Sequence, residues 1–198
     1  MASNHVFRFK VTVLEVEPTI WRRFEVPATY NFWDLHVAIQ DVMGWQDYHL
    51  HEFRLQGSEK GVPVLVGLPD DESDAGRQTL PGWQTAVREF ISQRGQVVRY
   101  EYDFGDGWEH EVVLEEVLFA EEGIAYPRCV AGERACPPED CGGPSGYAEF
   151  LAAIRDPGHA RHADLIEWIG EAFDAEEFDP SRVQFDDPKE RWEIAFSE

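Results

Sequence analysis

The chain opens with a run in which apolar and polar residues alternate, over residues 6–16. Phe7, Phe9 and Val11 fall on one face of this run, and polar residues lie between them. A period of two is typical of a half-buried strand. A second alternating run covers residues 20–26. The sequence therefore begins with two predicted strands.

The next apolar residues recur at helical spacing between Phe32 and Met43. A helix buries residues that recur three and four positions apart. Here these residues are Leu35, Ala38, Ile39 and Val42. Asn31 precedes the helix as a candidate N-cap, and Gly44 follows it as a candidate C-cap. His36 and Gln40 lie off the apolar stripe, so we expect them to face solvent.

The segment richest in special residues is Tyr100–Glu111, which lies between two strand-like runs, residues 98–104 and 108–114. Gly105-Asp106-Gly107 joins the runs and supplies residues that tolerate positive φ. The pattern predicts a hairpin with aromatic side chains on one face. We expect His110 to point inward, beside Trp108.

The segments around this hairpin are less regular. Residues 44–55 predict a turn and a strand, and Pro63–Leu68 a short edge strand within an exposed acidic loop, 57–82. A modest helix is predicted at Gln84–Gln93. Residues 119–146, with many prolines and glycines, predict a long irregular connection.

The last third of the chain is helical in pattern. Ser145 is a candidate cap for a helix that ends before Asp156, and a second helix is predicted over residues 161–173. The acidic stretch 174–198 contains a possible strand at Arg191–Phe196. Together these elements predict an α+β fold: a mostly antiparallel sheet, a helix after the second strand, and a C-terminal helical hairpin packed on the sheet.

Size and composition predict a single domain over residues 1–198, with a variable acidic loop at 57–82 and an acidic tail at 181–198. The chain has 17 basic and 39 acidic residues, a formal net charge of −22. Such a charge repels nucleic acid, because binding to phosphates depends on Lys and Arg. It favours a protein partner, or mimicry of DNA toward a basic protein, or solubility alone.

Location is predicted from three features. No apolar run is long enough to span a membrane. The first ten residues lack the apolar segment of a secretory signal. Three cysteines cannot all pair in disulfides, which favours a reducing compartment. We therefore expect a cytoplasmic protein without a membrane partner.

Two sets of residues are candidates for a metal site. On a strand, His49 and His51 would project to one face, and His110 would complete a ligand set. Structural roles for these histidines are the alternative. The second set consists of Cys129, Cys136 and Cys141, spaced C-x6-C-x4-C. Three thiolates and an outside histidine would bind zinc, but no paired C-x2-C is present, and reduced thiols in a rigid loop are the alternative.

Acid–base chemistry has one set of candidates, centred on His110. An inward imidazole beside Asp103 or Asp106 could act as a general base, with Glu111 as a further acidic group. It is equally compatible with a core histidine that stabilises the turn. The sequence contains no complete catalytic set, so we favour a non-enzymatic role.

Candidate binding residues occur in two motifs. Trp21, Arg22 and Arg23 could bind a phosphate or carboxylate, although pairing with the chain's own acidic residues is the simpler interpretation. The cysteine-containing motif adds Glu139 and Asp140. We include Trp108 of the central motif as an aromatic binding candidate.

Several motifs together resemble one known family, the plasmid Ri open-reading-frame-three-like family, also described as insertion-element passenger TnpR proteins. The motifs are Ile20-Trp-Arg-Arg, Leu35-His36, Gly44-Trp45 with His49-Leu-His-Glu-Phe, Tyr100–His110, and Cys136–Tyr147. The similarity runs from about Val6 to Pro180. It implies a bacterial or archaeal α+β protein carried on plasmids and mobile elements, with no established biochemical role. The label TnpR suggests a resolvase, but no serine-recombinase active site or basic DNA-binding segment is recognisable.

Three functional hypotheses follow. The first is a non-catalytic interaction module with an acidic surface, encoded by a mobile element or its host. The second is a metal-binding protein or metal-dependent enzyme, with zinc as the candidate cofactor, built from the histidine or the cysteine set. The third is a DNA mimic that binds a basic protein. Convergence of His49, His51, His110 and the Cys136–Cys141 loop in one cavity would favour the second.

Overall fold

The computed structural model describes residues 4–57, 62–69, 79–170 and 172–196. Within them a single sheet of eight strands has the order β5-β4-β3-β6-β7-β1-β2-β8. The strands are β1 His5–Val13, β2 Trp21–Pro27, β3 His51–Leu55, β4 Val64–Gly67, β5 Thr79–Pro81, β6 Val97–Tyr102, β7 Trp108–Phe119 and β8 Arg128–Glu133. All neighbours are antiparallel except β4 and β5. The predicted α+β class and mostly antiparallel sheet are confirmed.

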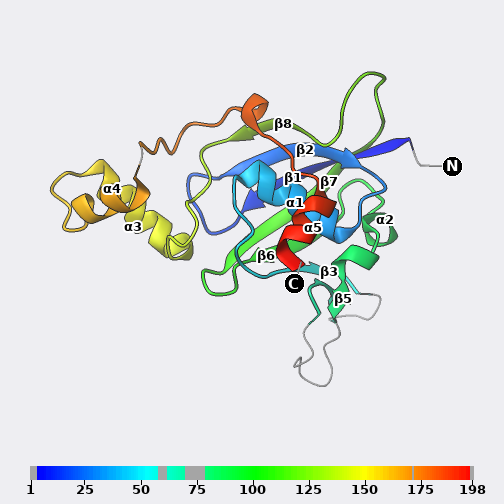
Figure 1. Cartoon of the computed structure of the whole chain (residues 1–198), viewed down its shortest axis with the longest axis horizontal. Helices are drawn as coiled ribbons and strands as arrows, with labels where there is room; N and C mark the ends of the chain where they lie inside the picture. The colour runs from blue at the N-terminus through cyan, green and yellow to red at the C-terminus, as the bar shows by residue number, and fades with distance from the viewer. Residues whose placement is uncertain (1–3, 58–61, 70–78, 171, 197–198) are drawn as a thin grey trace.

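Five α-helices and two short 3-10 helices complete the part of the fold that the structure describes (Figure 1). They are α1 Phe32–Met43, η1 Gly82–Gln84, α2 Val87–Phe90, α3 Gly143–Arg155, α4 His162–Ile169, η2 Pro180–Arg182 and α5 Pro188–Phe196. Within the described part of the chain, no helix is long and apolar enough to cross a membrane.

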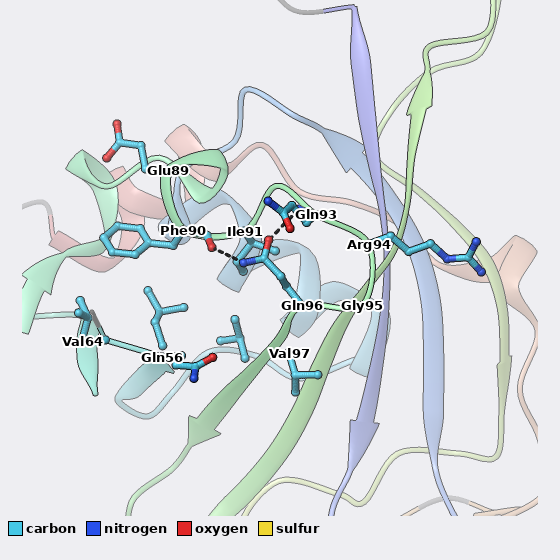
Figure 2. A pocket seen from close by; sticks show the side chains of 13 residues that line it. Gln56, Val64, Glu89, Phe90, Ile91, Gln93, Arg94, Gly95, Gln96 and Val97 are labelled. Carbon is cyan, nitrogen blue, oxygen red and sulfur yellow. Dashed lines mark hydrogen bonds between the residues drawn. The ribbon is translucent and has the colours of Figure 1, made fainter. Parts of the chain in front are cut away.

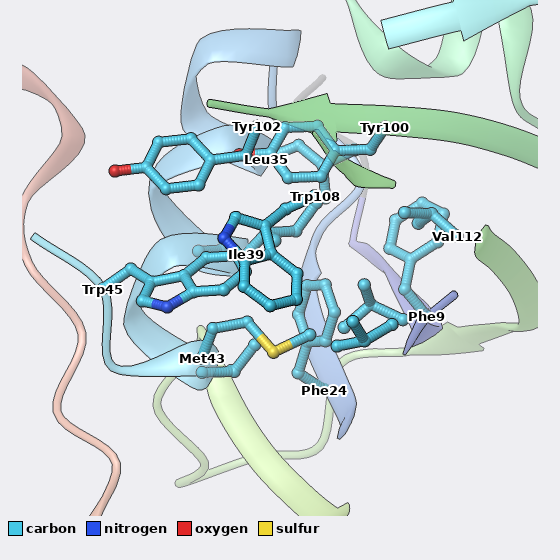
Figure 3. Packing of buried hydrophobic residues seen from close by; sticks show 14 of the residues in the cluster. Phe9, Phe24, Leu35, Ile39, Met43, Trp45, Tyr100, Tyr102, Trp108 and Val112 are labelled. Carbon is cyan, nitrogen blue, oxygen red and sulfur yellow. The ribbon is translucent and has the colours of Figure 1, made fainter. Parts of the chain in front are cut away.

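Helix α1 covers one face of the sheet, and its predicted bounds are confirmed. Asn31 and Asp34 form a reciprocal capping box, with 2.9 Å from the Asp34 amide to Asn31 Oδ1. Gly44 ends the helix with φ of 84°. Figure 3 shows Leu35 and Ile39 packed against sheet aromatics. The aromatic residues of this core include Phe9, Phe24, Tyr100, Tyr102 and Trp108.

The prediction for His36 and Gln40 is wrong: both are fully buried. Their polar groups hydrogen-bond to the Tyr100 hydroxyl, at 2.8 Å from His36 Nδ1 and 2.9 Å from Gln40 Nε2. Burial of a polar side chain is tolerated when its hydrogen bonds are satisfied. The helix therefore buries a wider face than its apolar stripe.

The opposite face of the sheet is lined with cross-strand ion pairs. Glu25 is fully buried between Arg8, at 2.7 Å, and Arg128, at 2.6 Å. Arg23 pairs with Glu115 at 2.6 Å. The acidic surplus is thus partly neutralised on this face.

Two predictions near the C-terminus and after β7 are wrong. The strand expected at Arg191–Phe196 is helix α5, in which Trp192 and Phe196 lie one turn apart and both contact Trp33. The connection over residues 119–146 contains strand β8, which pairs with β2 and forms an edge of the sheet.

The helix expected at Gln84–Gln93 is reduced to η1 and the four-residue α2. The strand expected at Pro63–Leu68 is present as β4, with β5 outside it as the edge. The rest of the acidic loop, residues 58–61 and 70–78, lies outside the described residues.

The C-terminal helical hairpin is present, formed by α3 and α4 beside one end of the sheet (Figure 1). It continues the hydrophobic core through Tyr147, Phe150 and Leu165. Helix α3 begins at Gly143, two residues before the predicted cap at Ser145. An added Cβ at Gly143 would clash with the Asp106 carbonyl oxygen, so this position requires glycine.

Candidate functional site

Three loops meet at the end of the central hairpin and form a three-loop surface, defined here as residues 45–50, 103–107 and 136–142. Hydrogen bonds join the first loop to the third, from Trp45 Nε1 to the Pro137 carbonyl at 2.9 Å and from the Gln46 amide to Glu139 Oε1 at 2.7 Å. The second and third loops are joined by the bond from the Gly142 amide to Asp106 Oδ2, at 3.0 Å. Three segments distant in sequence are thereby fixed together.

Asp103 stabilises the tip of the hairpin. Its Oδ1 accepts hydrogen bonds from the amides of Gly105, at 2.9 Å, and Asp106, at 3.2 Å. Its backbone lies in the left-handed region, with φ of 55°. Aspartate tolerates this region better than most residues with a Cβ. Asp103 therefore has a turn-forming role, and only its Oδ2 points toward the neighbouring loops.

His49 lies between two carboxylates on this surface. Its Nε2 is 2.9 Å from Asp140 Oδ1 and 3.5 Å from Asp103 Oδ2. The exposed fractions of the three side chains are 30% for His49, 65% for Asp140 and 10% for Asp103. The cluster is open to solvent on the Asp140 side.

The structure separates His51 from His49. His51 begins β3 and is buried, with its ring stacked on His36 at a centroid distance of 3.4 Å and an interplanar angle of 8°. Burial, reinforced by the neighbouring His36, lowers the pKa of His51 well below its usual value. The two histidines belong to different clusters.

The buried cluster consists of His36, Asp47 and His51, connected to Tyr100 and Gln40. His36 Nε2 is 2.8 Å from Asp47 Oδ1, and the opposite nitrogen bonds the Tyr100 hydroxyl. Both ring nitrogens of His36 are therefore occupied. A cation midway between two parallel rings would lie out of both ring planes, away from the nitrogen lone pairs. The cluster is better suited to support the core than to bind a metal.

His110 is buried in the core and not gathered with the other candidates. Its Nδ1 lies 3.3 Å from the Tyr100 carbonyl oxygen, and its Nε2 has no hydrogen-bond partner among the described residues. Burial lowers the pKa of His110 to about 4. Glu111, proposed as an acidic companion, pairs with Arg99 at 3.5 Å. Trp108 is buried in the core.

The three cysteines have separate surroundings. Cys129 donates to the Arg23 carbonyl at 3.6 Å, and the Cys136 thiol lies 3.6 Å from Met43 Sδ. Burial raises the pKa of Cys129 to about 11, and those of Cys136 and Cys141 to about 12. Among the described residues, two groups bring three ligand atoms within 4.8 Å of one another, and neither contains a cysteine or His110.

The arginine motif is engaged within the protein. Arg22 is buried and donates to the carbonyl oxygens of Val42, Trp21 and Glu133, each at 2.9 Å. Val42 lies in the last turn of α1, so the guanidinium stabilises that helix end. Arg23 pairs with Glu115 and lies over Trp21, 5.1 Å from the ring centroid.

A pocket of about 770 Å³ lies at the end of β6 opposite the three-loop surface (Figure 2). Its lining combines apolar residues such as Val64, Phe90 and Val97 with glutamines. Gln96 bonds the Phe90 carbonyl at 3.0 Å and shapes the wall. The described residues of its lining include the charged Glu89 and Arg94 but no histidine, cysteine or aspartate, so it offers fewer candidate metal ligands than the three-loop surface.

Comparison with known proteins identifies the family. The model of the plasmid pRiA4b ORF-3-like proteins matches residues 5–182. The chain belongs to the plasmid pRiA4b ORF-3-like family. It is 41% identical over 166 residues to the uncharacterized protein y4hQ of Sinorhizobium fredii, covering 83% of this chain and 81% of y4hQ. It also resembles the crystal structure of MM3350 from Methanosarcina mazei Go1, a protein of unknown function, with a TM-score of 0.83 and 39% identity. That match covers 91% of this chain and 98% of MM3350.

As a pRiA4b ORF-3-like protein, the chain has its three-loop surface inside the matched region, whereas α5 lies beyond residue 182. His49, Asp103 and Asp140 were predicted as separate candidates and not as one group, and Asp47 was not predicted. Asp47, Asp103 and Asp140 share one feature, a backbone with positive φ, and no pattern in the sequence predicted it.

Proposed function

We propose that this protein is a non-catalytic binding module that docks a basic, partly apolar segment of another protein on the three-loop surface. One observation carries the proposal: large hydrophobic side chains are exposed there beside carboxylates. The exposed fractions are 70% for Tyr48, 55% for Leu50 and 52% for Phe104. Exposed apolar side chains grouped beside polar ones are typical of interaction sites.

The charge of the surface specifies the partner. The three loops contain five acidic residues, of which Asp106, Glu139 and Asp140 are at least partly exposed, and none of their residues is Lys or Arg. With a net charge of −22, the protein attracts basic partners at long range and repels nucleic acid. Lys and Arg side chains can satisfy the carboxylates while their neighbours cover the apolar groups.

The surface is also held in shape before any partner binds. Leu50 is fixed by the bond from the Asp103 amide to its carbonyl, at 2.9 Å, and Tyr48 by the bond from its amide to the Tyr102 hydroxyl, at 3.0 Å. A preformed surface loses less conformational entropy on binding. This favours docking with little rearrangement of the module.

The test is fluorescence anisotropy with labelled peptides that combine arginine and leucine, compared with peptides in which glutamate replaces arginine. The site variant is Tyr48→Ser with Asp140→Asn. Its matched control is Phe119→Ser with Glu122→Gln, which removes an exposed aromatic and an exposed carboxylate elsewhere. We expect salt-sensitive binding of the arginine peptides that the site variant weakens at least about tenfold and the control leaves unchanged.

Equal weakening by the two double variants would mean that the peptides respond only to net charge, and would refute docking at this surface. Absence of binding to any arginine peptide at low salt would refute the proposed partner class.

A further inference from the structure

We propose that His49, Asp103 and Asp140 form a binding site for one divalent transition-metal cation. The site goes beyond the docking function and does not depend on it, because it rests on the positions of three ligand atoms. His49 Nε2, one Asp103 oxygen and one Asp140 oxygen all lie within 4.8 Å of one another.

Two of the three separations match those around a small cation. Nitrogen and oxygen ligands lie about 2.0–2.2 Å from such metals, so neighbouring ligand atoms are about 3.0–3.5 Å apart in octahedral and tetrahedral sites. The distances from His49 Nε2 are 2.9 Å to Asp140 Oδ1 and 3.5 Å to Asp103 Oδ2. Small side-chain adjustments would complete the geometry.

The single proton that His49 Nε2 can carry is not enough to hydrogen-bond both carboxylates. The Nε2 atom carries at most one proton, which its bond to Asp140 uses. The 3.5 Å separation from Asp103 Oδ2 is at the limit for a hydrogen bond, so the second carboxylate faces the same nitrogen without a proton of its own. A cation between the three atoms interacts with both carboxylates and with the nitrogen lone pair.

The surroundings orient the ligands. Two backbone amides hold Oδ1 of Asp103, which leaves Oδ2 directed toward His49. The His49 ring packs against Tyr102 at a centroid distance of 5.9 Å, and the Tyr102 hydroxyl bonds Glu139 at 3.2 Å. Such supporting contacts fix the orientation of metal ligands.

The contrast with the buried cluster supports the choice of site. His36 and His51 are stacked face to face, and both His36 nitrogens are already bonded. In the surface cluster only one ring is present, and its Nε2 points at both carboxylates.

The ligand set indicates the class of cation. One imidazole nitrogen and two carboxylate oxygens suit zinc, manganese or cobalt better than calcium, which prefers oxygen ligands alone. Because Asp140 is 65% exposed, remaining coordination positions are open to water or to a ligand.

The experiment uses the full chain purified without a histidine tag and stripped with a chelator. Zinc binding is measured by calorimetry, and cobalt binding by visible absorption. The variants are Asp103→Asn and Asp140→Asn, since asparagine also tolerates positive φ and keeps one acceptor oxygen. The matched control is Asp156→Asn with His159→Gln, at the turn between α3 and α4.

We expect one cation per chain, with affinity at least about tenfold weaker in each site variant and unchanged in the control. Thermal unfolding of each apo variant distinguishes loss of a ligand from loss of the fold.

No saturable binding, or equal affinity in the site variants and the wild type, would overturn the proposal. So would a thiolate-to-cobalt charge-transfer band, which would place the metal on the cysteines. Each of these failures leaves the peptide experiment unaffected, because that experiment contains no metal.

Discussion

Two clusters of histidine and aspartate lie in different environments, although one histidine of each is separated from the other by only two positions. The buried cluster combines His36, Asp47 and His51, and the surface cluster combines His49, Asp103 and Asp140. In the first, Tyr100 and Gln40 satisfy the polar groups on the core side. In the second, two carboxylates converge on one nitrogen at the solvent boundary.

The difference shows that residue type and spacing do not determine chemical role. His49 and His51 are two positions apart, yet one precedes strand β3 and the other begins it. The position of the strand start places one ring on a loop and the other in the core. Burial, ring stacking and hydrogen bonds at both His36 nitrogens give the buried group a structural role, whereas the surface group keeps its ligand atoms next to solvent.

The largest expected difference between the clusters is the loss of unfolding free energy when a histidine of each is replaced. We expect His36→Leu to lower the free energy of unfolding by about 3 kcal/mol, because the Tyr100 hydroxyl and the Asp47 carboxylate each lose their buried hydrogen bond to the imidazole. His49→Leu should cost less than about 1 kcal/mol, since exposed ion pairs contribute little. Urea unfolding checks both values, and equal losses would contradict the assignment.

Acid should destabilise the protein through its buried histidines. The pKa of His110 is about 4 in the fold and 6.5 for an ordinary histidine, so between these values the unfolded chain binds a proton that the folded chain does not. Stability therefore falls as pH falls. We expect this group to contribute a loss of about 2 kcal/mol between about pH 7 and pH 5.

The variant His110→Met tests the source of this loss. It removes the titrating ring, so the decrease in unfolding free energy on acidification should be about 2 kcal/mol smaller than in the wild type. An unchanged pH dependence would assign the acid sensitivity elsewhere, for example to His51, whose pKa is also lowered by burial.

Removal of helix α5 should change the packing around the buried cluster and leave the surface cluster unchanged. It covers Trp33, whose ring lies 5.2 Å from His36 and 6.0 Å from His51. Ending the chain after Asp187 should lower the melting temperature by about 2–4 °C, because the Trp33 contacts and the pair between Asp41 and Arg191 are lost. Differential scanning calorimetry measures the shift.

In the same truncated protein, affinity for cobalt and for arginine peptides should be unchanged. The substitution Ile194→Ser is the control, since this side chain is 81% exposed and its removal should not alter the melting temperature. Weaker ligand binding after truncation would show that the two clusters are coupled.

The smallest stability effect is expected on the surface. Asp140→Asn should change the free energy of unfolding by less than about 0.5 kcal/mol, because the side chain is 65% exposed and its ion pair is screened. A loss above about 1 kcal/mol, measured by urea unfolding, would show that Asp140 is a structural residue.

The sequence predicted the elements whose signals are local. The alternation in β1 and the apolar stripe and caps of α1 depend on neighbouring residues. The bounds of α1 agree with the structure, whereas the strand predicted over residues 6–16 is observed as His5–Val13. Helix α5 was misassigned because Trp192 and Phe196 gain their contacts from Trp33, which is distant in sequence. Strand β8 was missed because pairing with β2 orders a segment whose glycine and prolines suggest a loop.

The candidate site was predicted only as separate residues. His49, Asp103 and Asp140 were named, but their proximity depends on hydrogen bonds between three loops. The burial of His36 could not be predicted from the local sequence either, because its partner Tyr100 is 64 positions away. Local patterns identify chemical groups, while tertiary hydrogen bonds decide which groups act together.

The tryptophans beneath α5 make the position of the C-terminal segment observable by optical spectroscopy. Trp192 packs edge-on against Trp33, with centroids 5.1 Å apart and planes at 89°, and lies 4.8 Å from Trp83. Indoles at such short distances and fixed angles couple excitonically and give a characteristic couplet in far-ultraviolet circular dichroism. Detachment of α5 would abolish that coupling without unfolding the sheet, so the protein carries an intrinsic, label-free reporter of its own C-terminal docking.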